Sequence, residues 1–156
     1  MKISSGWEQS VFTLLILSRL PEEKYMNAAI LAKRLEVSPT YLKKLLKLLV
    51  DEDLINSIRG KDGGFSLAVP IEKIDFYQVF IAIEGHGKTF FSRHFLAKFL
   101  GKKREEIKNC AITNTLDIVE NTLKITMSSI TLEQLEQEIL RDYDMEDLDD
   151  WIAKNV

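Results

Sequence analysis

The chain has few of the sequence features that are typical of secreted or membrane proteins. Its 156 residues include a single cysteine, Cys110, which rules out a disulfide framework within one chain and suits a reducing compartment. No apolar run approaches the roughly 18–20 residues that span a bilayer. The N-terminus lacks the cationic, apolar pattern of a secretory signal. These absences predict a cytoplasmic protein with no membrane partner.

The sequence also lacks the residue sets that catalysis requires. It contains no evident nucleophile–base pair, phosphate-binding loop or metal set, so we do not expect an enzyme. The two histidines, His86 and His94, lie in the same region as Cys110, but their spacing fits no standard zinc pattern. We therefore expect no metal and no cofactor.

The charge is unevenly distributed along the chain. The net charge is −3, yet residues 1–70 hold ten Lys or Arg against eight Asp or Glu. The segment from Leu132 onward holds two against nine. A mildly basic N-terminal half is compatible with nucleic-acid binding, and the acidity belongs to the far end.

Three helices are predicted in the first third of the chain. Apolar residues recur at helical spacing over 6–19, and Pro21 ends that helix. Asn27 is a suitable N-cap for a short helix over 28–35, and Ser38 for a third helix over 39–51. Two short helices joined by a tight turn are typical of a helix-turn-helix.

The third helix has two distinct faces. One is apolar and comprises Leu42, Leu45, Leu46 and Leu49. The other is polar and comprises Thr40, Tyr41, Lys43, Lys44 and Lys47. Taken alone, the lysines could form a solvated surface or a DNA-binding one.

A glycine-rich hairpin follows this helix. Strands are predicted over 54–58 and 65–68, and the connection 59–64 contains three glycines that permit a tight turn. Arg59 and Lys61 lie at its tip. A basic hairpin directly after a lysine-faced helix resembles a wing that contacts phosphates or a minor groove, and the succession favours DNA binding over a plain surface hairpin.

These segments resemble a known family. The stretch 41–46, the pair 54–55 and the string 57–68 (SIRGKDGGFSLA) are similar to the Rrf2 (IscR-like) family of winged helix-turn-helix regulators, which includes an iron–sulfur regulator and a repressor of cysteine metabolism. Ile83-Glu84-Gly85 and the opening Met1–Ser4 also match. The resemblance covers residues 1–85 well and the later helix loosely.

The resemblance implies a mainly α fold with a small β-hairpin wing and a long C-terminal dimerisation helix. We expect a DNA-binding domain over 1–85, an effector loop and dimerisation helices over 86–140, and an acidic tail over 141–156. It also implies a homodimer that binds a partly palindromic operator of double-stranded DNA. Regulators of this family are more often repressors. The residues expected to contact DNA are Ser38, Thr40, Tyr41, Lys43, Lys44, Lys47, Arg59, Lys61, Gly63 and Gly64.

Many members of the family hold a two-iron cluster through three cysteines and a histidine before the long helix. The equivalent loop here, about 86–109, contains no cysteine, and Thr113 stands where the family often has histidine. Cys110 alone cannot supply a set of mostly sulfur ligands. We expect no iron–sulfur centre in one chain.

A long helix is expected from Ile112 onward. Its apolar residues follow heptad-like steps, which indicate a seam for a second copy of the chain. The seam comprises Ile112, Leu116, Val119, Leu123, Thr126 and Ile130. Thr131 opens a capping box for a helix over 132–140. In the acidic tail, Leu148, Trp151 and Ile152 could form an apolar edge that packs on the dimer or competes with DNA, although such tails are more often solubilising.

The sequence leaves several identities possible for the effector. Phe91, Phe95 and Phe99 form a stripe that suits core or subunit interface better than a small-molecule pocket. Cys110 is either a buried structural thiol or a redox sensor. The effector is therefore an unknown small molecule, an oxidant acting on Cys110, or a partner protein bound to the C-terminal half.

Overall fold

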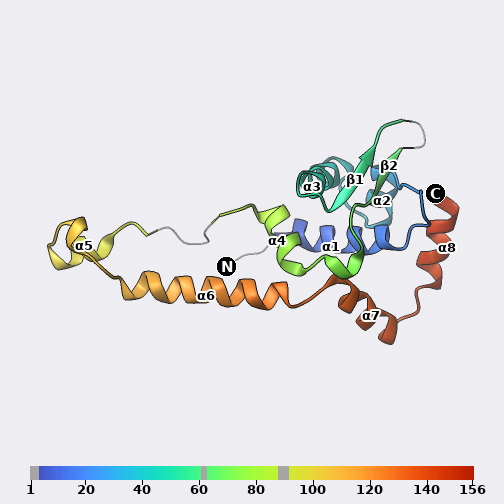
Figure 1. Cartoon of the computed structure of the whole chain (residues 1–156). Helices are drawn as coiled ribbons and strands as arrows, with labels where there is room; N and C mark the ends of the chain where they lie inside the picture. The colour runs from blue at the N-terminus through green and yellow to red at the C-terminus, as the bar shows by residue number, and fades with distance from the viewer. Residues whose placement is uncertain (1–3, 61–62, 88–91) are drawn as a thin grey trace.

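A computed structural model describes residues 4–60, 63–87 and 92–156. The fold is mainly helical with one two-stranded antiparallel hairpin (Figure 1). The helices are α1 (Ser5–Ser18), α2 (Ala28–Arg34), α3 (Pro39–Asp51), α4 (Phe76–Glu84), α5 (Phe95–Leu100), α6 (Ala111–Ser128), α7 (Leu132–Asp142) and α8 (Glu146–Asn155). The strands are β1 (Ile55–Ile58) and β2 (Gly64–Leu67), and two short 3-10 turns cover Ile71–Lys73 and Arg104–Glu106.

Side-chain caps begin the helices where the sequence predicts them. Asn27 accepts a hydrogen bond from the Ala29 N–H at 2.8 Å, and Ser38 accepts one from the Tyr41 N–H at 3.4 Å. Each cap satisfies a backbone donor that the first helical turn leaves without a partner. The α3 bounds match the prediction, those of α1 differ from it by one residue at each end, and α2 ends one residue earlier than predicted.

The core gathers around α1, α2 and α3. Leu14, Leu31, Leu42 and Leu46 are fully buried, and Val79 of α4 closes the same cluster. Helix α1 is buried on most sides, so even Ser10 and Thr13 are inside. Their hydroxyls donate to the carbonyls of Gly6 and Gln9, one turn earlier, which removes the cost of burying them.

The long helix extends away from this core, and α5 lies at its far end (Figure 1). Helix α6 ends at Ser128, so Ile130, predicted to continue the apolar seam, lies outside it. The reason is local: the Ile130 carbonyl accepts from the Phe76 N–H at 3.0 Å, and the Leu132 N–H donates to Ile74 at 2.8 Å. These bonds bend the chain into α7, whose Thr131 capping box is present as predicted.

The acidic tail forms a packed helix instead of a solvated appendage. In α8, Ile152 is buried in the main cluster, and Leu148 and Trp151 pack against it. The apolar edge predicted for these three residues is therefore correct, and it faces the core of its own chain. Among the described helices, none is both long and apolar enough to cross a membrane.

Candidate DNA-binding surface

The two faces of α3 separate as the sequence predicts. The four leucines of its apolar face are buried, and Thr40, Lys43, Lys44 and Lys47 are exposed. The Lys47 ammonium lies 3.9 Å from the Asp51 carboxylate. Both side chains are exposed, so this pair is weak and a phosphate could displace it.

Tyr41 is held more closely than the lysines. A Cβ placed on Gly6 would lie 2.6 Å from the Tyr41 hydroxyl, so the ring leans back over the start of α1. Ser38 uses its side chain to cap α3. Both residues therefore help to position the exposed helix face, whatever further contacts they make.

The backbone geometry of the wing explains why it contains glycines. Gly60 has a φ of +128°, and the Gly63 N–H donates to its carbonyl at 3.2 Å to close the turn. A Cβ on Gly64 would lie 2.5 Å from the Met26 carbonyl oxygen, because Met26 and Phe65 exchange two backbone hydrogen bonds there. Arg59 is exposed, and Lys61 lies outside the described residues.

Helix α3 and the wing project from the same edge of the molecule (Figure 1). The connection between them is tight: β1 starts four residues after α3 ends, and the Leu54 N–H donates to the Leu49 carbonyl at 3.0 Å. The helix and the described part of the hairpin therefore share one exposed surface, here called the reading head (α3 with residues 55–60 and 63–67).

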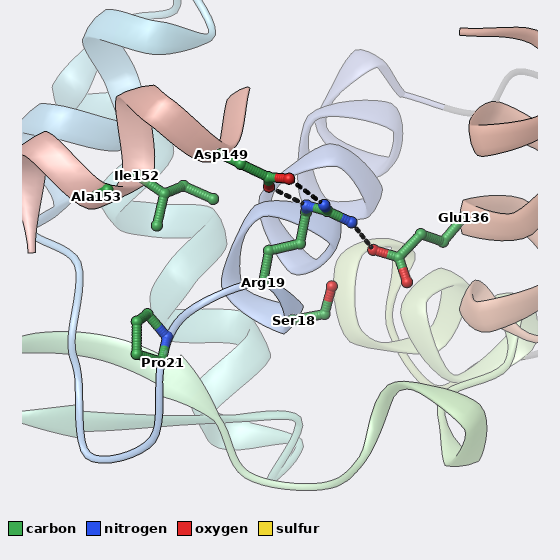
Figure 2. Close-up of a pocket in the computed structure, with 7 residues that line it drawn as sticks. All are labelled: Ser18, Arg19, Pro21, Glu136, Asp149, Ile152 and Ala153. Atoms are coloured by element: carbon green, nitrogen blue, oxygen red, sulfur yellow. Dashed lines mark hydrogen bonds and ion pairs between the residues drawn. The ribbon is translucent and has the colours of Figure 1, made fainter. Parts of the chain in front are cut away.

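An arginine at the end of α1 anchors the C-terminal helices. Arg19 donates two 2.6 Å bonds to Asp149 of α8 and one of 3.1 Å to Glu136 of α7, beside a hollow of about 420 Å³ (Figure 2). The Arg19 guanidinium lowers the pKa of Asp149, and the Asp149 carboxylate raises the pKa of Arg19. Neither the sequence periodicity nor any motif indicated this contact.

A second arginine joins α8 to the first helix of the helix-turn-helix. Arg34 bonds Asp147 at 2.7 Å, and its guanidinium carbon lies 5.3 Å from the centre of the Trp151 ring. Helix α8 therefore touches α2 directly. The acidic segment neutralises two arginines of the domain that carries the reading head.

Cys110 lies half-buried just before α6. It borders a small cavity of about 140 Å³ that His94, Arg104 and Ser92 also line. The Thr113 backbone N–H and hydroxyl lower the pKa of the thiol. His86 lies apart from this group and bonds Glu52 at 2.7 Å.

The long helix exposes apolar residues to solvent. Ile112 and Val119 of the predicted seam are exposed, and Leu116 and Leu123 are half-buried. The heptad count missed Ile118 and Ile125, which are also exposed and stand seven residues apart. The apolar surface of α6 is therefore wider than the predicted seam.

Residues 3–138 match the model of the Rrf2 family, described as iron-dependent transcriptional regulators. The chain belongs to the Rrf2 family. It is a DNA-binding transcriptional regulator, from a family of regulators and not of enzymes.

Curated relatives agree with this assignment. A protein of Lactococcus lactis named as the HTH-type transcriptional regulator YffB is 53% identical, over 97% of both chains. The Bacillus subtilis protein named as the HTH-type transcriptional regulator YwgB is 35% identical over 100% of this chain and 97% of its own. IscR of Cereibacter sphaeroides is 30% identical over 54% of this chain and 56% of its own.

Solved structures share the fold. A transcriptional regulator from Listeria innocua superposes with a TM-score of 0.67 at 22% identity, covering 94% of this chain and 91% of that one. CymR, the global cysteine regulator of Bacillus subtilis, superposes with a TM-score of 0.66 at 22% identity, covering 88% and 98%. The mainly helical fold with a winged helix-turn-helix is thus confirmed.

The residues of this regulator do not fit the iron that the family description names. Among the described residues, no group of three or more His, Cys, Asp or Glu side chains converges on one point. Near the family's cluster position stand one thiol, Cys110, and one imidazole, His94, with the cationic Arg104 beside them. A two-iron cluster takes four protein ligands, mostly thiolates, and one thiol with one imidazole does not supply them within one chain.

Proposed function

We propose that this Rrf2 protein is a homodimeric, sequence-specific DNA-binding repressor that works without an iron–sulfur cluster. The observation that carries the proposal is the reading head: a lysine-faced helix and a glycine-tipped hairpin exposed on one edge of the domain. Its double-stranded DNA target would place the protein in the cytoplasm.

The contacts divide into two kinds. Helix α3 would enter the major groove, where Thr40, Tyr41 and Lys44 reach base edges and supply selectivity. Cations would contact phosphates and supply salt-sensitive affinity, and Ser38 would position the first turn. The phosphate set comprises Lys43, Lys47, Arg59 and Lys61. Gly63 and Gly64, whose missing side chains permit the close approaches to Ile58 and Met26, would shape the wing that contacts the adjacent minor groove.

A dimer would supply two reading heads. The exposed apolar residues of α6 need a partner, and a second copy of α6 is the simplest one. Half-sites of such dimers lie about one DNA turn apart, on the order of 34 Å. A partly palindromic operator follows from the twofold symmetry.

The test starts with DNA selected from a random pool, followed by gel-shift titration of two variants. We expect Lys44→Ala and Arg59→Ala each to weaken operator binding roughly tenfold. Arg59→Ala, which removes a phosphate contact, should also reduce the slope of log affinity against log salt by about one, whereas Lys44→Ala should relax base selectivity. Lys154→Ala, on α8, is the matched control. Parental affinity for both variants, with circular dichroism unchanged, would refute the assignment.

A second candidate is regulation through the thiol of Cys110. It is supported by the half-buried position and the lowered pKa of that cysteine, because the thiolate is the oxidisable form. Operator affinity measured before and after peroxide treatment, in the parent and in Cys110→Ser, tests it. Equal affinities in all four samples would eliminate this candidate.

A further inference from the structure

An apolar groove with an acidic rim lies between α1 and α7. Its volume is about 350 Å³, and here it is called the acid-rimmed groove. Its floor is formed by Trp7, Val11, Phe12, Leu15, Phe76, Leu135, Ile139 and Tyr143. Its rim carries Glu8, Glu138 and Asp142. A second hollow, lined by Ile130 and Glu133, continues it and shares Phe76, Leu135 and Glu138 with it.

The groove has features of a site that something covers. Phe12 and Tyr143 expose large aromatic surfaces. The Trp7 ring meets Phe76 edge-on at 4.9 Å, and its Nε1 is buried with no hydrogen-bond partner among the described groups. An occupant that brings apolar surface would cover the exposed rings.

The complementary surface is on the same chain. The segment 95–103, here called the basic arm, exposes 64% of Phe95 and 83% of Phe99. Lys98, Lys102 and Lys103 are exposed beside them. The arm is thus apolar and cationic where the groove is apolar and anionic, so opposite charges would surround the apolar contact.

The arm lies at the far end of α6, away from the groove of its own chain (Figure 1). Helix α6 has 18 residues, so about 27 Å of helix stands between the side of the arm and that of α7. If two copies of α6 pair antiparallel, the N-terminal end of one helix meets the C-terminal end of the other. The arm then lies beside the partner's Ile130 and α7, where the groove begins.

We propose that the basic arm of one subunit inserts Phe95 and Phe99 into the acid-rimmed groove of a second copy, and that the exchange is reciprocal. This inference rests on the homodimer proposed above and adds to it a docking site outside α6. It connects the effector region to α1, the central helix of the DNA-binding domain. Binding of the arm would therefore influence the reading head of the partner.

Cross-linking between two differently labelled chains tests the contact. In a Cys110→Ser background, one chain carries Phe99→Cys and the other Glu8→Cys, and a short bifunctional maleimide is added to the mixture. We expect a cross-linked heterodimer. The control pair, Phe99→Cys with Glu36→Cys on the α2–α3 turn, should give none. A heterodimer yield no greater than that of the control would overturn the proposal.

Charge reversal provides an independent test. Lys98→Glu with Lys102→Glu should raise the dimer dissociation constant at least tenfold, measured by analytical ultracentrifugation. Adding Glu138→Lys and Asp142→Lys to the same chain should recover most of that loss. If all variants dimerise like the parent, the docking is wrong and the α6 dimer stands. If the parent itself is monomeric at micromolar concentration, both the docking and the proposed dimer are wrong.

Discussion

Removal of the Arg19 side chain should loosen the contact between the C-terminal helices and the DNA-binding domain. Arg19 makes three charge-assisted hydrogen bonds, two to Asp149 and one to Glu136. Exposed ion pairs contribute about 0.2–1 kcal/mol, and loss of one partner of a buried pair costs about 3–5 kcal/mol. The exposed fractions are 20% for Arg19, 13% for Glu136 and 48% for Asp149, which places this group between those limits.

We therefore expect Arg19→Ala to lower the free energy of unfolding by about 1–2 kcal/mol, part of it from leaving Glu136 unpaired. For a chain of this size that corresponds to a fall in Tm of roughly 3–6 °C. Urea unfolding followed by circular dichroism, with calorimetry for Tm, measures both. Arg141→Ala is the matched control, because Arg141 is exposed and bonds only its neighbour Asp142, at 3.4 Å, among the described residues.

The same variant has a predictable pH dependence. Arg19 lowers the pKa of Asp149 in the folded chain. A lowered carboxyl pKa stabilises the fold above the unfolded pKa, about 3.9, and this contribution disappears as the pH falls through the folded value. The stability difference between parent and Arg19→Ala should stay constant from about pH 5 to 9 and narrow below about pH 4. No difference at neutral pH, or one no larger than in Arg141→Ala, would refute the reasoning.

Three further predictions concern single positions. Gly64→Ala should lower the free energy of unfolding by about 1–3 kcal/mol, because its Cβ would meet the Met26 carbonyl. Gly87→Ala is the control and should be neutral, since nothing lies within 4 Å of its Cβ. Equal urea midpoints for the two variants would contradict this. Ile152→Ala should expose α8 to limited proteolysis while operator binding persists, and an unchanged cleavage pattern would count against docking. Thr113→Val removes the hydroxyl and keeps the backbone N–H, so it should raise the pKa of Cys110 in part, seen as a higher pH midpoint for iodoacetamide alkylation; an unmoved midpoint would show that the Thr113 hydroxyl does not stabilise the thiolate.

The sequence by itself determined the local elements of the reading head. The caps at Asn27 and Ser38, the leucine spacing of α3 and the turn glycines Gly60 and Gly63 act within a few residues of each other, so their structure can be predicted without the fold. The same holds for the Thr131 capping box. Gly64 differs, because the Met26 backbone that it approaches belongs to a distant segment. The expectation that one chain holds no iron–sulfur centre also rests on the sequence alone, because the loop before α6 lacks the cysteines.

Only the tertiary structure decided how the C-terminal third packs. The apolar edge at Trp151 and Ile152 was visible as a pattern, but the pattern could not show whether it faces the core, a partner or solvent. The Arg19–Asp149 contact joins residues 130 positions apart, and such pairing depends on the path of the whole chain. The end of α6 at Ser128 depends likewise on hydrogen bonds that Phe76 and Ile74 provide from a distant segment. Periodicity reports which face of a helix is apolar, and the packing of other elements decides what that face contacts.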